Sequence, residues 1–227
     1  LIEGEAGVIP ENRSPWMREG WYNKAQNWIK AEINQRGLTF VKPIAQERVW
    51  GVSCVLHAKT NQGKFFFKAG INTPLTANEP KLMTALGKKY PEHIPMPIAI
   101  HETERWMLLP DIGEPFWHAS DDDLEMAWRT LGQIQVDLAG QVDELLAMGC
   151  QDRRLDKLSG QINPFLSNPQ ALSDLSEDEI SQLQTLIPDL EMRCQQLGFY
   201  NLPESIIHGD LYKGNLAHKD GQTKIFD

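Results

Sequence analysis

Three side chains near the end of the sequence could together handle a proton and a divalent cation. Asp210 and Asn215 lie five positions apart within residues 208–215, and Asp227 follows twelve positions later. A carboxylate can accept the proton of a hydroxyl group, and amide and carboxylate oxygens are ligands that Mg²⁺ accepts. Phosphoryl transfer needs this combination, because it depends on a positioned base and on metal ions that neutralise charge. The alternative is a buried loop with polar caps, since Asp, Asn and Gly are common turn formers.

The sequence after Asn215 predicts a hairpin that would bring Asp227 beside it. Residues 216–218 form the first expected strand, residues 220–221 (Asp-Gly) a tight turn, and residues 223–226 the return strand. An Asp-Gly pair between β-prone runs is a strong signal of a hairpin. Two ligands that are distant in sequence could then share one cation.

Residues 208–215 read His-Gly-Asp-Leu-Tyr-Lys-Gly-Asn, which has the form H-G-D-L-x-x-x-N. Protein kinases carry H-R-D-x-x-x-x-N at the catalytic loop, so Gly209 stands where they have arginine. With Asp227 following, this pattern resembles the aminoglycoside phosphotransferase family of small-molecule kinases, with fructosamine kinase-like and choline kinase-like enzymes as relatives. The resemblance extends over residues 40–227 and is most specific at residues 208–227.

This resemblance implies an α+β, bilobal protein-kinase-like fold, with an antiparallel β N-lobe of five strands and a mostly helical C-lobe. It also implies transfer of the γ-phosphoryl group of ATP to a hydroxyl group of a small molecule. Asp210 would be the general base, and Asn215 and Asp227 would bind Mg²⁺. Lys213 would touch the transferred group in place of the absent arginine, whereas His208 would have a structural role.

A lysine that contacts the α- and β-phosphates of ATP is expected on a strand of the N-lobe. Residues 63–69 read Gly-Lys-Phe-Phe-Phe-Lys-Ala, and strand alternation places Lys64 and Lys68 on one face. Lys68 is favoured over Lys64 because it ends the strand before the next helix, as the resemblance implies. Glu79 would hold Lys68 through an ion pair. Pro80 places Glu79 at the entrance of that helix rather than inside it.

A turn between the first two strands is the candidate for covering the phosphates. Residues 46–53 contain one glycine, and neither G-x-x-x-x-G-K-[ST] nor G-x-G-x-x-G occurs in the sequence. The chain is therefore not a P-loop NTPase. Backbone amides around Trp50 and Gly51 would cradle the phosphates, with Ser53 as an added donor. An ordinary β-turn is the alternative.

Residues 108–114 resemble the hinge that joins the two lobes of a kinase, where backbone groups bind adenine. Leu109 and Asp111 are the candidates, since only their N–H and C=O groups need take part. The acidic residues 121–123 could suggest a metal site. They precede an expected helix, however, and a helix N-terminus favours negative charge through its dipole.

Apolar spacing and turn residues predict the elements that position these residues. Helices are expected, from three-and-four spacing of apolar residues, at residues 21–37, 79–90, 124–146 and 176–198. Strands are expected, from β-prone runs, at residues 39–42, 52–59, 64–69, 98–101 and 106–109. Residues 1–15 are expected to be a loose lead-in. Residues 150–173, which contain Pro164 and Pro169, are expected to form a loop.

The predicted domains are an N-terminal lead-in with its helix, a kinase-like N-lobe and a kinase-like C-lobe. Their bounds are residues 1–37, 38–109 and 110–227. Leu1 is not a methionine and Asp227 is itself a motif residue. Both ends are therefore expected to be cut, and the C-lobe to be incomplete.

The composition limits the partners. The net charge of −9 over 227 residues disfavours nucleic acid, which usually needs a basic face. It would suit a cationic acceptor such as an amino sugar, although plain solubility explains it more simply. Three scattered cysteines without a C-x-x-C pair argue against a zinc site and for a cytoplasmic location. No apolar run approaches the ~20 residues that span a bilayer, so no membrane partner is expected.

Two other functions fit parts of this pattern. A protein kinase is disfavoured because Gly209 replaces the arginine and the sequence leaves no room for an activation segment. A pseudokinase that senses nucleotides or binds a partner protein is the alternative from another class. Such proteins usually lose the lysine, the base or a magnesium ligand, and none is lost here. The acceptor stays open among aminoglycosides, amino sugars, choline-like amines and glycated amines, and the oligomeric state is not indicated.

Overall fold

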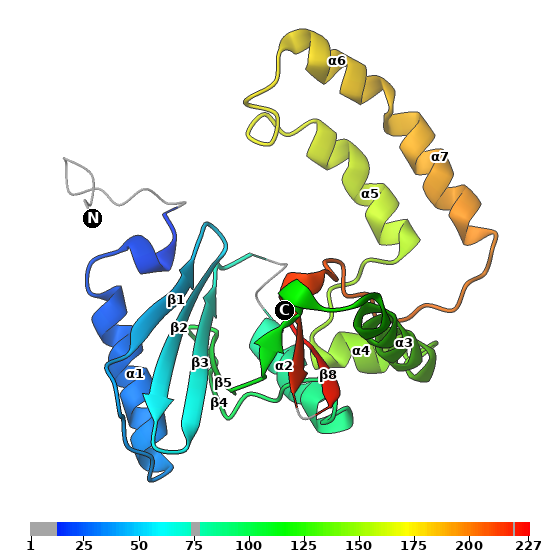
Figure 1. Cartoon of the computed structure of the whole chain (residues 1–227). Helices are drawn as coiled ribbons and strands as arrows, with labels where there is room; N and C mark the ends of the chain where they lie inside the picture. The colour runs from blue at the N-terminus through cyan, green and yellow to red at the C-terminus, as the bar shows by residue number, and fades with distance from the viewer. Residues whose placement is uncertain (1–12, 74–77, 220) are drawn as a thin grey trace. The chain divides into compact units, whose positions relative to one another are not determined.

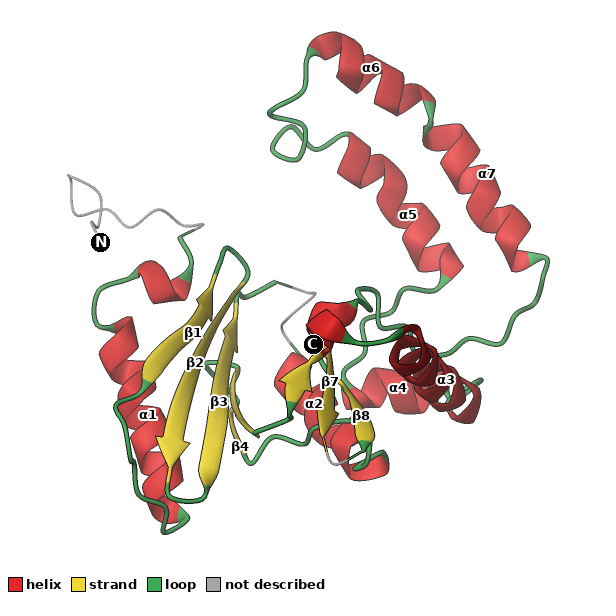
Figure 2. Cartoon of the chain, viewed as in Figure 1, coloured by secondary structure: helices red, strands yellow, loops and turns green. Residues whose placement is uncertain are grey.

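The computed structural model describes residues 13–73, 78–219 and 221–227 (Figure 1). The chain forms two compact units, one of Leu1–Gln135 with Ile207–Asp227 and one of Val136–Ile206. Figure 2 shows that the strands belong to the first unit, whereas the second consists of helices and loops. In the described part of the chain, no helix has the length and apolar character needed to cross a membrane.

A five-stranded antiparallel sheet in the order β1-β2-β3-β5-β4 dominates the first unit. Its strands are β1 (Ala45–Val49), β2 (Ser53–Thr60), β3 (Gly63–Gly70), β4 (Ala99–His101) and β5 (Trp106–Pro110). The predicted hairpin of β2 and β3 is confirmed, with Thr60 paired to Gly63 across a two-residue turn. The strands predicted at residues 98–101 and 106–109 are also confirmed as β4 and β5. The sheet has the five strands that the resemblance implies for the N-lobe, and four of them lie where the sequence predicts them.

The helix α1 (Trp21–Gln35) packs against one face of this sheet (Figure 1). Its residues Ala25, Ile29 and Ile33 are fully buried, because their helical spacing places them on one side. Gly37, at φ +69°, follows the helix, as expected for a glycine beyond a C-terminus. Since alternate residues of a strand face opposite ways, Phe67 packs toward α1 and the next residue of β3 points to the other face.

The first strand lies later in the chain than predicted. Residues 39–42 make only an isolated bridge to β2, and β1 begins after Pro43, which lacks the N–H that a ladder needs. The sequence of β1, Ala-Gln-Glu-Arg-Val, has weak β-propensity, so its pairing with β2 decides its conformation. Residues 46–49, predicted as part of the turn, therefore belong to a strand. The turn itself is reduced to residues 50–52.

The hairpin predicted at residues 216–226 belongs to a second, three-stranded sheet. Its strands are β6 (Glu114–Pro115), β7 (Leu216–Lys219) and β8 (Gln222–Ile225), in that order. The predicted hairpin is confirmed as β7 and β8. Asp220 of the predicted turn lies outside the described residues, and Gly221 has φ +78°. The hairpin is joined to the segment before β4 by a bond from the Ile225 amide to the His93 carbonyl at 2.8 Å.

The remaining helix of the N-lobe is α2 (Glu79–Lys89), as predicted. Asn78 is its N-cap, Glu79 its first residue and Pro80 its second, one position later than expected for the proline. A short 3₁₀ helix, η1 (Pro15–Met17), precedes α1, and two others, η2 (Phe116–His118) and η3 (Lys213–Asn215), flank β6 and β7.

The predicted single helix at residues 124–146 is wrong. The structure has α3 (Asp121–Asp137) and α4 (Val142–Met148), separated at Gly140, which has φ +77°. Glycine adopts this left-handed conformation without steric cost, so the helix can stop there. Apolar residues at Leu138, Val142 and Leu145 continue the helical spacing across the break, which is why periodicity did not reveal it.

In the second unit, the predicted loop at residues 150–173 is also wrong, because it contains α5 (Leu155–Leu166). Pro164 lies near the end of this helix, and apolar residues such as Leu158 and Ile162 have helical spacing.

The predicted capping box of Ser176 and Glu179 is confirmed. The helix it opens ends earlier than predicted, giving α6 (Glu177–Thr185) and α7 (Ile187–Gly198). Proline in the first turn of α7 lacks the N–H that would continue α6. The helices α5 and α7 pack against each other.

Gly113 lets the backbone after β5 approach β7 closely. Its φ is +95°, and a Cβ atom there would lie 2.1 Å from the His218 carbonyl oxygen. Gly113→Ala is therefore expected to lower the free energy of unfolding by at least ~2 kcal/mol, through backbone strain and a steric clash. Urea denaturation monitored by circular dichroism measures this change. Gly132→Ala in α3, where a Cβ would meet nothing within 4 Å, is the control and should be neutral or stabilising. Equal midpoints for Gly113→Ala and wild type would contradict the close approach.

Candidate active site

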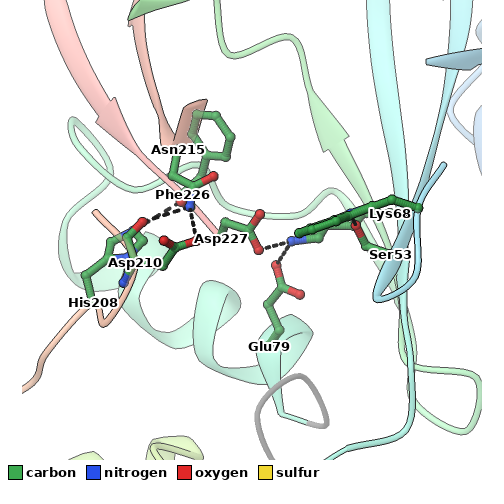
Figure 3. Close-up of polar contacts among 9 residues, drawn as sticks. Ser53, Lys68, Glu79, His208, Asp210, Asn215, Phe226 and Asp227 are labelled. Atoms are coloured by element: carbon green, nitrogen blue, oxygen red, sulfur yellow. Dashed lines mark hydrogen bonds and ion pairs between the residues drawn. The ribbon is translucent and has the colours of Figure 1, made fainter. Parts of the chain in front are cut away.

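Three of the predicted site residues converge in the first unit (Figure 3). The Lys68 ammonium on β3 donates to Glu79 Oε1 of α2 at 2.6 Å and to the Asp227 carboxylate after β8. The side chains of Lys68 and Glu79 are only 11% and 12% exposed. Strand alternation places Lys68 on the face opposite α1, where the helix α2 and the hairpin can reach it.

Burial and the neighbouring charges have opposite effects on the pKa of Lys68. Burial lowers the pKa of Lys68, but the attraction of Glu79 and Asp227 outweighs it and raises the pKa above its ordinary value. The lysine therefore keeps its proton. Burial raises the pKa of the Glu79 carboxyl and Asp227 raises it further, while Lys68 opposes both. Two carboxylates thus share one ammonium, which leaves negative charge that a bound cation would balance.

Asp210 and Asn215 are hydrogen-bonded to each other beside this group. The Asn215 Nδ2 donates to the Asp210 backbone carbonyl at 2.9 Å and to Asp210 Oδ2 at 3.3 Å. Asn215 is buried, and its backbone carbonyl accepts from the Phe226 amide at 3.1 Å. Figure 3 shows the Asp227 carboxylate between this pair and Lys68. Since Nδ2 is used as a donor, Oδ1 of Asn215 is left for metal coordination.

His208 fixes the loop that carries the predicted base. Its Nε2 donates to the Phe226 carbonyl at 3.2 Å, and its Nδ1 accepts from the Asp210 amide at 3.4 Å. Gly209 between them has φ +84°, a conformation that favours glycine. Lys213 lies in η3 within the same loop. His208 thus joins the loop at residues 208–215 to Phe226, the residue that precedes Asp227.

A magnesium site would need ligands from outside the protein. In residues 13–73, 78–219 and 221–227, no three His, Cys, Asp or Glu side chains form a metal-binding cluster. The predicted ligands are instead one amide and one carboxylate, Asn215 and Asp227. Mg²⁺ commonly binds through one or two protein groups and completes its octahedral shell with water and substrate phosphates. The donor set therefore fits a metal that arrives with a nucleotide.

The turn that would cover the phosphates is held by its own side chains. The Trp50 indole donates to Ser53 Oγ at 2.6 Å, and the Trp50 amide donates to the Ser53 carbonyl at 3.1 Å. The Ser53 hydroxyl accepts this bond and so keeps its own hydrogen for another acceptor. A Cβ atom on Gly51 would meet nothing within 4 Å. The turn is thus open on one side.

The two predicted adenine-binding positions lie in β5, which pairs with β3, and directly after it. Leu109 is buried in β5 and pairs with Phe66. The Asp111 carbonyl oxygen accepts from the Lys219 ammonium, so this oxygen already has a donor. Lys219 was not suggested by the sequence, and nothing local to it marks a role, because the two residues are 108 positions apart.

Lys64 and the acidic run have partners of their own. The Lys64 ammonium donates to the Glu47 carboxylate at 3.1 Å. It takes no part in the contact of Lys68 with Glu79 and Asp227. Residues 121–123 form the first turn of α3, as the helix-start interpretation predicts. Hydrogen bonds from Ser120 to the Asp123 carboxylate at 2.7 and 2.9 Å hold the pKa of that carboxyl below its ordinary value.

No protein-family model and no curated protein matches this sequence. Among solved structures, the chain is similar to a macrolide 2'-phosphotransferase type I, with a TM-score of 0.56 and 11% identity, covering 88% of this chain and 70% of that one. It is also similar to the apoenzyme of macrolide 2'-phosphotransferase MphH from Brachybacterium faecium, with a TM-score of 0.60 and 15% identity, covering 88% and 71%. These likenesses confirm the predicted fold, a kinase-like phosphotransferase fold with antiparallel sheets and a helical part.

Proposed function

We propose that this chain is a small-molecule kinase of the aminoglycoside phosphotransferase family, which transfers the γ-phosphoryl group of ATP to a hydroxyl group. The observation that carries this proposal is the contact of Lys68 with Glu79 and Asp227, next to the hydrogen-bonded pair of Asp210 and Asn215. A general base, a phosphate-binding lysine and an oxygen donor pair for a metal are the parts that phosphoryl transfer needs. The kinase-like fold supports the same function.

The nucleotide would bind between the sheet and the hairpin of the first unit. Lys68 would give up part of its contact with Asp227 and donate to the α- and β-phosphates. The hydrogen bond to Glu79 would keep the ammonium oriented. Asn215 Oδ1 and the Asp227 carboxylate would hold Mg²⁺, which neutralises charge on the phosphates when it is bound. The Ser53 hydroxyl, already oriented by Trp50, would donate to a phosphate oxygen.

Asp210 would act on the acceptor. Its carboxylate takes the proton of the acceptor hydroxyl as that oxygen bonds to the γ-phosphorus, and the bond from this phosphorus to the leaving oxygen of ADP breaks. The Asn215 amide, which donates to Asp210 Oδ2, orients the carboxylate for this step. Orientation of the base matters because most of the catalysis in this chemistry is positioning and charge stabilisation.

The acceptor class is a hydroxyl-bearing small molecule. The two similar structures described above are named as macrolide 2'-phosphotransferases, so macrolides belong in the set to be tested, together with amino sugars and other cationic acceptors. The net charge of −9 would favour the approach of cations. A cytoplasmic location is proposed because the reaction uses ATP and the three cysteines are free thiols.

Lys68→Met is expected to weaken the binding of Mg·ATP by roughly ten- to a hundredfold. A hydrogen bond to a charged group contributes about 1.5–3 kcal/mol, and each ~1.4 kcal/mol is a tenfold change in Kd. Isothermal titration calorimetry measures this Kd. Lys64→Met is the matched control, since its ion pair with Glu47 lies near the surface and contributes little. Equal Kd values for Lys68→Met and wild type would remove the lysine from the nucleotide site and with it the support for this function.

A further inference from the structure

Two buried side chains that precede α1 donate hydrogen bonds to backbone carbonyls of the turn between β1 and β2. The Ser14 hydroxyl donates to the Gly51 carbonyl at 3.0 Å, and the Trp16 indole donates to the Trp50 carbonyl at 3.1 Å. Ser14 and Trp16 are 9% and 8% exposed. These donors are 37 and 34 positions from their acceptors. Consecutive carbonyl groups of one turn are therefore fixed by a distant segment of the chain.

Peptide geometry determines where the neighbouring amides point. The described chain contains no cis peptide bond, and in a trans peptide the C=O and the following N–H point in opposite directions. With the carbonyls of Trp50 and Gly51 held by the N-terminal donors, the amides of Gly51 and Val52 point away from them. Among the described residues, neither amide donates to a backbone acceptor.

The amides of Gly51 and Val52 point toward the face of the sheet that carries Lys68. Trp16 packs edge-on against Trp21 of α1, with ring centroids 6.2 Å apart, and Trp21 packs against Phe67 at 6.0 Å. The N-terminal donors thus belong to the α1 side of the sheet. Lys68 follows Phe67 on β3 and so faces the other side. Two backbone donors and the lysine therefore share one side.

We propose that Ser14 and Trp16 are positioning residues of the nucleotide site, which hold the turn so that the amides of Gly51 and Val52 face the phosphates of ATP. This inference rests on the proposed function. The side chain of Trp50 anchors the same turn to Ser53, and the Arg48 guanidinium lies over its ring at 4.9 Å. Holding the turn before the ligand arrives avoids the loss of conformational entropy that ordering a free turn would cost on binding.

The test compares ligands with and without phosphate groups. In the double variant Ser14→Ala, Trp16→Phe, the aromatic ring stays in the core and both hydrogen bonds to the turn are lost. Its Kd for Mg·ATP, measured by isothermal titration calorimetry, is expected to rise by about tenfold, while its Kd for adenosine is unchanged. Ser14→Thr, which keeps the hydroxyl, should bind Mg·ATP like wild type. A general structural defect would weaken both ligands together.

Tyr22→Phe is the matched control. The Tyr22 hydroxyl on α1 donates to the Ile44 carbonyl at 3.0 Å, so this variant loses a similar bond away from the turn and should keep the wild-type Kd. If the double variant does not fold, Ser14→Ala alone gives the same comparison with a smaller rise in Kd. An unchanged Kd for Mg·ATP, or equal losses for ATP and adenosine, overturns this inference alone. A wild-type protein that does not bind Mg·ATP overturns the proposed function and this inference with it.

Discussion

Replacing Asp210 by alanine is expected to lower kcat by about 10²–10⁴-fold and to leave the Kd for Mg·ATP within a few-fold of wild type. The reason is that the carboxylate takes a proton in the transition state but is hydrogen-bonded through the loop, not to the lysine that would hold the phosphates. Initial rates of ADP release at saturating acceptor, with calorimetric binding of the nucleotide, separate the two effects.

Asp210→Asn is the control for structure in this experiment. Asparagine has nearly the size of aspartate and can still accept the bond from the Asn215 side chain, but it cannot take up the proton. It should be as inactive as the alanine variant and as stable as wild type. Activity above about a tenth of wild type in either variant would exclude Asp210 as the base, since general base catalysis contributes at least about 10²-fold.

The second large effect is expected from Asp227→Asn. This carboxylate is proposed to bind Mg²⁺, and it contacts the Lys68 ammonium. Loss of its charge should raise the Mg²⁺ concentration for half-maximal activity by at least about tenfold, because carboxylates are preferred ligands of this cation. A titration of the rate with Mg²⁺ at fixed ATP measures the change.

The variant Glu79→Gln distinguishes a loss of metal binding from a loss of the lysine contact. Glu79 bonds the same ammonium at 2.6 Å but is not proposed to touch the cation. It should weaken the binding of ATP while leaving the Mg²⁺ titration in place. If Asp227→Asn and Glu79→Gln shift the Mg²⁺ titration equally, or if neither shifts it, Asp227 is not a metal ligand.

The sequence predicted the parts of the fold in which local pattern and tertiary structure agree. The hairpin at residues 216–226 follows from an Asp-Gly turn between β-prone runs. Strand alternation placed Lys64 and Lys68 on one face, and the family resemblance favoured Lys68. The Ser176 capping box is also a local signal, because it depends on four consecutive residues. In each case, the local signal and the tertiary contacts favour the same conformation.

The elements that were missed depend on contacts with distant residues. The strand β1 has weak β-propensity and forms because β2 pairs with it. The break between α3 and α4 occurs at Gly140 without any interruption of the apolar spacing. The donors Ser14 and Trp16 and the Lys219 bond to Asp111 join residues between 34 and 108 positions apart. No local pattern in a single sequence indicates such pairs. The predicted domain bounds and the roles of the site residues stay predictions.

Transfer of the γ-phosphoryl group itself is the most direct test of the proposed function. Purified protein is incubated with Mg·ATP and a panel of macrolides, aminoglycosides, amino sugars and choline-like amines, and mass spectrometry detects acceptors that gain one phosphoryl group while ADP is quantified. We expect at least one acceptor to be phosphorylated, with one ADP released for each phosphate transferred, and no product with Asp210→Ala. Binding of Mg·ATP without ADP release above that of Asp210→Ala, for every acceptor, would contradict a kinase and favour a nucleotide-sensing pseudokinase.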